Sequence, residues 1–380
     1  MGAVALFWIS VILIGYTYLG YPLLIRAWAA RHPGRPAAGC DLPSVSVVIV
    51  AHDEGARIAA RIENLLALSY PKDRVEILVG SDGSTDDTAA RARTFTGDGV
   101  RVDDFKERRG KAAVLGDLLP LCRGEIVVLA DARQRFEATA LEALLRPFGD
   151  PAVGAVGGEL ILTDRPVATT VSRGVGLYWR CETAIRASES RIDSTVGASG
   201  AVYAIRRALF EPIPADTILD DVLIPMRIAR RGYRVVFEAG ARAYDQPAET
   251  PRQEFVRKVR TIAGNFQLFA RELWLLDPRR NRLWLQTVSH KGLRLLGPVL
   301  LAAILGSNVL LADRPLYAAT LLAQGIFYAA ALGGALAGAG RGGAVLAVPY
   351  TVCLLNWATA VAFLRVVTGR QRVTWERAPV

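Results

Sequence analysis

The sequence predicts an α/β domain, built on a mostly parallel sheet, between N-terminal and C-terminal transmembrane helices. Short β-branched runs alternate with helical spacing between residues 44 and 275. That alternation is typical of a parallel sheet with helices on both faces. Long uncharged stretches lie on either side of this region. Acidic residues follow several of the predicted strands, at the edge where sheets of this class bind ligands.

Four stretches contain no charged residue: 1–25, 295–312, 315–340 and 342–364. A transmembrane helix needs about 20 apolar residues, so the first, third and fourth stretches are long enough and the second is marginal. Buried core helices are the alternative explanation. Four such stretches in one chain favour a multi-pass protein of the cell membrane.

Basic residues next to these stretches predict the orientation. The first stretch lacks the basic start of a cleaved signal peptide, and we interpret it as a retained anchor. Arg26, Arg31 and Arg35 follow it, so the positive-inside rule places the domain after them in the cytoplasm.

The basic residues at the C-terminal end and the number of apolar stretches predict opposite sides of the membrane for the tail. A cytoplasmic tail is favoured by its basic residues Arg365, Arg370, Arg372 and Arg377, yet four crossings would put that tail outside. The short stretch 295–312, which contains Gly297-Pro298, is therefore expected to lie in the interface or to re-enter.

The net charge and the cysteines restrict which partners and metals the chain is expected to bind. The formal net charge of +10 is compatible with nucleic acid, anionic lipid or a phosphate-bearing substrate. Because much of the excess lies beside the apolar stretches, membrane lipids explain it best, and no nucleic-acid partner is expected. The four cysteines show no CxxC spacing, which indicates neither a zinc site nor a disulfide framework.

The domain plan follows from these patterns. We expect a transmembrane helix over 1–27, a Pro/Gly-rich linker over 28–43, a catalytic domain over 44–275, an interfacial segment over 276–294, two or three transmembrane helices over 295–367 and a basic cytoplasmic tail over 368–380. Within the catalytic domain we expect strands over 45–50, 75–80, 100–102, 125–130, 155–162 and 233–237, helices over 56–68 and 110–121, a helix opening at 219–223, and a basic amphipathic stretch over 251–276.

Acidic residues mark the carboxyl ends of the first, second and fourth predicted strands. They are Asp53, Asp82 and Asp131, and Asp220-Asp221 opens a later helix. Each has a purely structural alternative, as a turn residue, a strand-end acid or a balance for a helix dipole. We also expect Ser84 or Thr85 to cap the helix that follows the second strand.

The order of these acids on one α/β frame resembles family 2 glycosyltransferases, which include cellulose, hyaluronan and poly-N-acetylglucosamine synthases. The resemblance covers about residues 44–270, and the flanking membrane stretches match the synthase-like members. It implies a GT-A fold, with a Rossmann-like sheet that binds a nucleotide-diphosphate sugar and Mg²⁺ or Mn²⁺.

The resemblance also implies roles on the donor side. The segment Ala51-His52-Asp53-Glu54 is similar to the first-strand motif near the nucleoside, and Asp82 to the nucleotide-binding aspartate. Lys111, in Arg109-Gly110-Lys111, resembles the family's RxGK element; a solvated turn is the alternative. Asp131 matches the first acid of the DxD motif, which holds the diphosphate through the metal.

On the acceptor side the resemblance makes Asp221 the general base, preceded by Asp220 in a TED-like motif. Gly200 falls in a segment, 197–203, similar to the acceptor-side loop; a tight turn without a ligand is the alternative. Arg257 and Arg260 match the spaced positions of QxxRW, with contact to lipid headgroups as the alternative.

Two departures from the family pattern stand out. The DxD equivalent is Asp131-Ala132-Arg133, so its second acid is replaced by a cation and we expect weaker metal coordination. Either Asp131 holds the metal with water and substrate oxygens, or Arg133 partly substitutes for it. The QxxRW equivalent lacks its Gln and Trp, which puts processive synthesis in doubt.

The predicted function is a membrane-bound, inverting glycosyltransferase that extends a polysaccharide or glycan. The alternatives are transfer of one sugar to a lipid-linked acceptor, or a catalytically silent subunit that guides a polymer. Trp179 and Glu182 are expected near the acceptor, and the tail 369–375 is similar to a cytoplasmic segment that approaches the site in synthases. His52 and His290 have no ligand spacing and are interpreted as structural.

Overall fold

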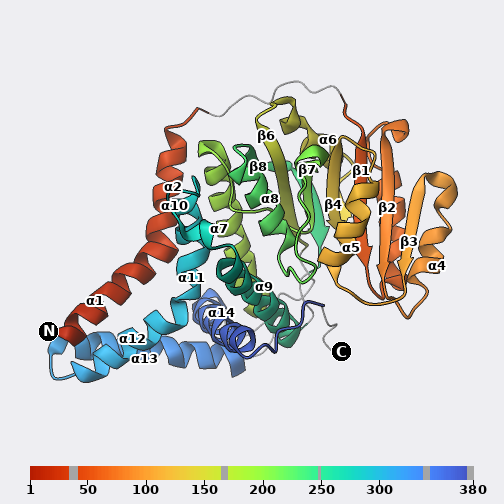
Figure 1. Ribbon diagram of the computed structural model, residues 1–380. Coiled ribbons are helices and arrows are strands. Elements are labelled where there is room, and N and C mark those ends of the chain that lie inside the picture. The colour runs from red at the N-terminus through yellow and green to blue at the C-terminus, as the bar shows by residue number, and fades with distance from the viewer. Residues whose placement is uncertain (34–41, 164–169, 247–249, 337–342, 375–380) are drawn as a thin grey trace.

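The computed structural model describes residues 1–33, 42–163, 170–246, 250–336 and 343–374 (Figure 1). Its centre is an eight-stranded sheet with the strand order β3-β2-β1-β4-β7-β6-β8-β5. The strands are β1 (Val45–Ala51), β2 (Val75–Asp82), β3 (Val100–Phe105), β4 (Ile126–Asp131), β5 (Arg135–Phe136), β6 (Val153–Leu162), β7 (Val202–Arg206) and β8 (Arg234–Asp245).

The predicted parallel sheet is confirmed in the first half of the domain. Strands β1, β2, β3 and β4 pair in parallel, as do β6 and β8. Strand β7 was not predicted and runs antiparallel to both β4 and β6. The sheet is therefore mixed. Because β4 and β7 run in opposite directions, the carboxyl end of β4 lies beside the start of β7.

Helices cover both faces of the sheet, as the continuous apolar strands require. On one face lie α3 (Gly55–Leu66), α4 (Thr88–Arg93) and α6 (Ala140–Leu145), and on the other lie α5 (Lys111–Leu118), α8 (Asp220–Arg230) and α9 (Pro251–Arg271). In α3, Ile58, Ile62 and Leu65 recur at helical spacing and are buried against the sheet. This packing fixes the strand ends, where the acids lie.

The cap predicted at Ser84 or Thr85 is wrong. Helix α4 begins at Thr88, after Asp87, and the carboxylate of Asp86 accepts the Thr88 N–H at 3.0 Å. A short Asp side chain can bond a backbone N–H two residues on, and here it outcompetes the hydroxyl caps. Ser84 and Thr85 instead bond to Asp53, across from the neighbouring strand.

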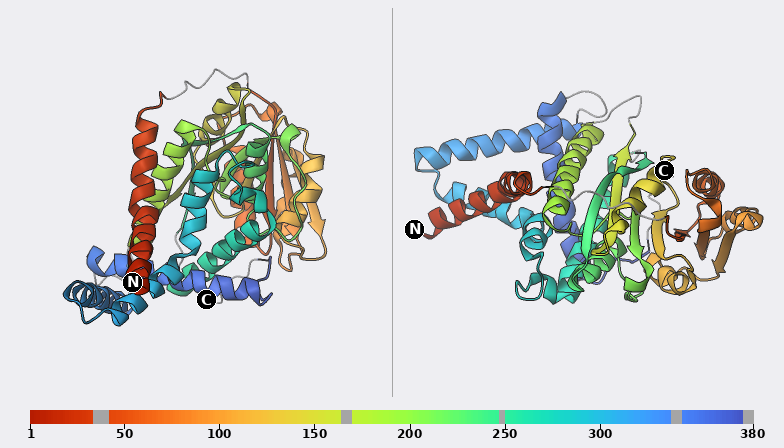
Figure 2. Two further views of the ribbon diagram at one scale, coloured as in Figure 1. Left: turned by 60° about the vertical axis from the view of Figure 1, so that its left-hand side comes forward. Right: turned by 90° about the horizontal axis from the view of Figure 1, so that it is seen from above.

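The remaining helices form a separate group beside the sheet (Figures 1 and 2). They are α1 (Gly2–Gly15), the π-helical η1 (Tyr16–Gly20), α2 (Tyr21–Ala30), α7 (Thr170–Ile192), α10 (Trp284–Gln286), the π-helical η8 (Thr287–Gly292), α11 (Leu293–Leu295), α12 (Gly297–Leu310), α13 (Pro315–Leu336) and α14 (Gly343–Val367).

Three helices of the described chain are long and apolar enough to cross a membrane: Gly2–Ala30, Pro315–Leu336 and Val345–Val367. A further pair, Trp284–Leu295 and Gly297–Leu310, satisfies the same criteria together but bends by 58° between its halves. The weak second stretch of the sequence thus corresponds to a broken helix.

The apolar helices are tied to the domain by buried contacts. Val259 and Ala263 of α9 pack against Ala358 and Ala362 of α14. Tyr21 and Ile25 of α2 pack against Ile185 of α7. Helix α9 therefore joins the sheet to the C-terminal apolar helices, and α7 joins it to the N-terminal apolar helix.

The last described residues return to the domain. Arg260 on α9 donates to the carbonyl of Val373 at 3.4 Å, and a Cβ added at Gly110 would lie 3.4 Å from Val373 Cγ1. The tail up to residue 374 therefore lies on the same side of any membrane as the sheet. Cys40, Arg35, Trp375 and Arg377 lie outside the described residues.

Candidate active site

The loop after β1 lies against the loop after β2. Asp53 has a positive φ of 52°, which Asp tolerates better than most residues. Its backbone N–H donates to Ser84 Oγ at 3.2 Å, and its Oδ1 accepts the Thr85 N–H at 2.7 Å. Ala51, the last residue of β1, is fully buried. The loop is thus held by bonds between backbone N–H groups and side-chain oxygens, one of them from Asp53, whose side chain still keeps 27% exposure.

Glu54 closes the same loop at the start of α3. Its N–H donates to Thr88 Oγ1 at 2.8 Å, and its carboxylate pairs with Arg57 at 2.9 Å. Glu54 is buried, so its contacts serve the loop and the helix start.

Asp82, at the end of β2, is fully buried and organises a second loop. Its two carboxylate oxygens accept the N–H groups of Arg109 at 2.7 Å and Gly110 at 2.9 Å. Gly110 has a φ of 93°, which side chains other than glycine rarely adopt. Asp82 thereby fixes the conformation from which Lys111 opens α5.

Lys111 pairs with acids from two different elements of the site. Its ammonium lies 3.0 Å from Asp131 Oδ1 and 3.4 Å from Asp220 Oδ2. Burial by itself lowers the pKa of Lys111, but the charges of Asp131, Asp220 and Asp221 raise it above its ordinary value. This lysine stays charged and holds together acids from β4 and α8.

Asp131 is open to a ligand, because its side chain keeps 33% exposure. Burial raises its pKa, but Lys111 and then Arg133 lower it below the ordinary value overall. Arg133 itself is exposed. Asp131 therefore carries a stable negative charge between two cations.

Asp221 lies at the first turn of α8, next to a glycine-rich loop. Its Oδ2 accepts the Gly200 N–H at 2.8 Å, and a Cβ at Gly200 would lie 3.3 Å from the same oxygen. Burial and then the charge of Asp220 raise the pKa of Asp221 to about 6, although Lys111 and Lys291 act in the opposite direction. A carboxylate with such a pKa accepts a proton near neutral pH.

Asp220 differs from its neighbour in its surroundings. It is 5% exposed, and its Oδ2 accepts the Tyr203 hydroxyl at 2.9 Å in addition to its contact with Lys111. Burial and the charge of Asp220 raise the Tyr203 pKa well above its ordinary value, so the phenol remains a donor. Tyr203 lies at the end of the predicted acceptor-side loop, but nothing in the sequence indicated this bond.

The two arginines of α9 lie in different places. Arg260 is influenced by the charges of Asp220, Asp131 and Asp221, although burial lowers its pKa. Arg257 keeps much of its surface exposed, but partial loss of water around the guanidinium, and then the charge of Arg133, lower its pKa. The structure thus brings Arg260 to the acids and leaves Arg257 near Arg133.

Arg61 was not among the residues predicted from the sequence. Its side chain is 3% exposed, stacks over the Phe136 ring at 4.1 Å, and donates to Asn64 at 2.9 Å. Burial lowers its pKa to about 9, while the charge of Asp131 opposes this. Its signal was a charged residue on the apolar face of α3, between Ile58 and Ile62.

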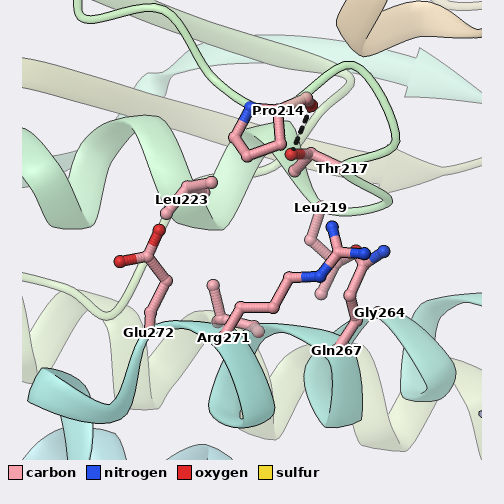
Figure 3. A pocket seen from close by; sticks show the side chains of 9 residues that line it. Pro214, Thr217, Leu219, Leu223, Gly264, Gln267, Arg271 and Glu272 are labelled. Carbon is pink, nitrogen blue, oxygen red and sulfur yellow. Dashed lines mark hydrogen bonds between the residues drawn. The ribbon is translucent and has the colours of Figure 1, made fainter.

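A small cavity lies elsewhere, between α8 and α9 (Figure 3). Its lining includes Pro214, Thr217, Leu223, Gly264 and Glu272. The Thr217 hydroxyl donates to the Pro214 carbonyl at 2.7 Å. The carboxylate of Glu272 is bound to Arg227 at 2.6 Å. The cavity offers mainly apolar surface, and the acids described above do not line it.

The fold and this site define the class of the domain. Its solved structural neighbours include the mannosyltransferase PcManGT from Pyrobaculum calidifontis in complex with GDP-Man and Mn²⁺. The TM-score is 0.75 at 24% identity, over 96% of this chain and 99% of that one. This likeness shows a GT-A fold that includes the flanking helices.

Sequence comparison identifies the family. Residues 43–264 match the model described as "Glycosyltransferase like family 2", and the chain belongs to this family. The family assignment and the GT-A fold predicted from the motifs are both confirmed.

Curated relatives are similar over the catalytic region. "Probable glycosyltransferase YdaM" of Bacillus subtilis is 26% identical over 59% of this chain and 56% of its own. "Poly-beta-1,6-N-acetyl-D-glucosamine synthase" of Staphylococcus aureus is 25% identical over 62% and 57%. "Beta-monoglucosyldiacylglycerol synthase" of Nostoc sp. is 33% identical over 39% and 33%. The chain thus spans little more than half the length of the first two relatives and a third of the last.

Proposed function

We propose that this chain is a membrane-bound, inverting glycosyltransferase that uses a nucleotide-diphosphate sugar, with Asp221 as the general base. One observation carries the proposal. Asp131, Asp220 and Lys111 meet from three separate elements, and Asp221 beside them has its pKa raised to about 6. Family membership supplies the reaction class.

The donor binds, in this proposal, at the carboxyl ends of β1, β2 and β4. Asp53 and Glu54 border the nucleoside, with Asp53 offering the more exposed carboxylate. Asp82 acts through the loop it bonds, because both of its oxygens hold backbone N–H groups. Lys111 and Arg260 face the diphosphate, where cations stabilise the charge of the leaving group.

A divalent cation fits the site in one way. Among the described residues there is no group of three His, Cys, Asp or Glu side chains that could hold a metal by themselves. Mg²⁺, however, is commonly held by one or two carboxylates together with substrate phosphates. Asp131 is exposed enough to be that carboxylate for Mg²⁺ or Mn²⁺. The bound cation would neutralise charge that develops on the diphosphate.

The acceptor hydroxyl reaches Asp221 from the side of the Gly200 loop. Asp221 takes the hydroxyl proton, and the oxygen displaces the diphosphate at the anomeric carbon. A single displacement of this kind inverts the configuration. Gly200 matters here because its missing side chain keeps the Asp221 carboxylate accessible.

The acceptor is a growing polysaccharide or a lipid-linked glycan, and one observation favours single transfer to a lipid. The family motif Trp that processive members carry is Thr261 in α9, and the Thr261 hydroxyl bonds its own helix at Arg257. That position offers no aromatic platform on which a sugar polymer could stack.

The membrane arrangement supports a catalytic domain and a tail on the same, cytoplasmic side. Val373 lies against Arg260, so an even number of crossings separates the sheet from the tail. Pro315–Leu336 and Val345–Val367 supply two, and the broken pair around Gly297 then does not cross. Arg26 and Arg31, which follow the first helix, favour the cytoplasmic side.

The test is a screen of nucleotide sugars with the purified full-length protein in Mg²⁺ and in Mn²⁺. We expect release of one nucleoside diphosphate, which depends on the cation and is lost on Asp131→Asn. A silent subunit would release none from any donor. Product length then separates polymer synthesis from single transfer.

A further inference from the structure

A second cluster of charged groups lies between α7 and η8, outside the site described above. Its centre is His290, whose side chain is fully buried. The Nδ1 atom of His290 is 2.9 Å from Glu189, and its Nε2 atom is 3.0 Å from Glu182. Tyr21 of the first helix donates to Glu189 at 2.6 Å. The cluster thus joins the N-terminal helix, α7 and the segment before α12.

Glu182 is surrounded by cations. Arg294 Nη1 lies 2.9 Å from its carboxylate, Arg186 Nε 3.4 Å and Lys291 Nζ 3.8 Å, in addition to His290. Burial raises the Glu182 pKa, but His290, Arg294 and Lys291 lower it well below the ordinary value. Glu182 is therefore permanently charged and acts as an anchor for these basic side chains.

Three basic side chains of the described residues share the single carboxylate of Glu182: Arg186, Lys291 and Arg294. Their side chains are 12%, 15% and 21% exposed. Cations that share one counter-charge in such a poorly solvated place are stabilised by a further anion. The cluster is consequently suited to an anion.

The position of Lys291 connects this cluster to the proposed base. The Lys291 ammonium, 3.8 Å from Glu182, also acts by its charge on Asp221, so it lies within electrostatic reach of the proposed base. Lys291 lies in the π-helical η8, and π-helical turns are frequent at functional sites.

The position of Arg294 connects the cluster to the bilayer. It lies three residues before Gly297, where the apolar helix α12 begins. Basic pockets beside membrane helices on the cytoplasmic side bind lipid headgroups. The phosphate of a lipid would lie at this level of the membrane.

We propose that Lys291 and Arg294, both held by Glu182, form a subsite for a lipid phosphate on the membrane side of Asp221, and that the acceptor is a phosphate-bearing lipid. This inference rests on the proposed function and names its acceptor class. Arginine grips phosphate oxygens with a planar fork, and lysine adds a point charge. A phosphate held there leaves the rest of the acceptor directed towards Asp221.

The experiment measures lipid binding to the purified full-length protein by native mass spectrometry, without donor. The probes are phosphatidic acid and diacylglycerol with the same acyl chains. We expect phosphatidic acid to bind more tightly, by about tenfold or more, and Lys291→Gln and Arg294→Gln to remove most of that preference. Arg280→Gln is the matched control, because Arg280 is 69% exposed on the same connection.

Several outcomes would overturn the proposal. These are equal binding of the two lipids, an equal loss in Arg280→Gln, and displacement of phosphatidic acid by inorganic phosphate at similar concentrations, which would indicate a free-phosphate site. If Arg294→Gln does not fold, Lys291→Gln decides, since Lys291 makes only the longest of the contacts to Glu182. Failure of the proposed function would appear separately, as absent donor turnover with lipid binding intact.

Discussion

The half of this domain that we propose to bind the donor (the donor half) and the half that we propose to bind the acceptor (the acceptor half) assemble their surfaces differently. In the donor half, β1, β2 and β4 are parallel neighbours, and each acid lies at or just after the end of its own strand. In the acceptor half, Asp221 on α8, Gly200 before β7 and Lys291 in η8 come from segments far apart in the chain.

The residues of the two halves are therefore positioned by different contacts. Loops after parallel strands are positioned by the sheet itself, so their residues converge once the strands pair. The acceptor side depends on packing between helices that also touch the membrane segments. Substitutions in the donor half should therefore change donor affinity, and substitutions in the acceptor half should change the rate of transfer.

The largest expected effect is that of Asp221→Asn. Loss of a positioned base typically lowers the rate by about 10²–10⁴-fold, and the amide cannot accept the hydroxyl proton. Sugar transfer should fall by that factor, while binding of the nucleoside diphosphate, measured by calorimetry, stays the same.

The control for this change is Asp216→Asn. Asp216 is half exposed and pairs with Arg271, away from the acids of the site. We expect transfer within about twofold of the unchanged protein, because exposed ion pairs contribute little. Full activity of Asp221→Asn would show that Asp221 is not the base. The contrast between the two halves would then no longer hold.

The next effect is that of Asp82→Asn on the donor half. The new amide nitrogen would face one of the two N–H groups that Asp82 now accepts. An unsatisfied buried N–H costs about 1–3 kcal/mol, so donor affinity should fall by roughly 5- to 150-fold. Titration with the nucleoside diphosphate measures this. Asp87→Asn, at a side chain 53% exposed, is the control and should bind normally.

The pH dependence of sugar transfer tests the ionisation of Asp221. Transfer should fall as pH drops through about 6, because Asp221 must be ionised. Its folded pKa lies above the ordinary 3.8, so its contribution to folding stability is present below that value and is lost as pH rises to about 6. Activity and this part of the stability thus change in opposite directions.

Asp220→Asn tests the cause of that shift. It removes a negative neighbour that raises the Asp221 pKa, so the acidic limb of the pH–rate profile should move to lower pH. An unchanged midpoint would show that the charge of Asp220 does not contribute to the shift, and a higher midpoint would contradict the prediction. Asp216→Asn should leave the midpoint in place.

The smallest expected effect is that of Gly110→Ala. A side chain at a φ of 93° costs about 1–3 kcal/mol, part of which the loop relieves by moving. Donor affinity should fall by only a few fold. Gly99→Ala is the control, because Gly99 also has a positive φ but has no atom near its Cβ. It measures the cost of backbone strain to folding without a change in the donor loop.

Much of the donor half could be predicted because its signals are local. Val45–Ala51 and Val75–Asp82 are apolar runs that lead directly into acids. The antiparallel strand Val202–Arg206 was missed, because its partners are distant in the sequence and its short apolar pattern resembles loop or core. The cap at Ser84 failed for a related reason, since Asp53 competes for that segment from another strand.

The fold class, the family and the order of the acids could all be read from the amino-acid sequence, because strand periodicity and strand-end residues are properties of neighbouring positions. How those acids are used depends on the folded chain. Folding bonded Asp82 to the backbone of the loop before Lys111. It brought Asp131 and Asp220 to the Lys111 ammonium. It also placed Lys291 and Arg294 beside Glu182. Charges act through space, and the distances between these groups are set by packing.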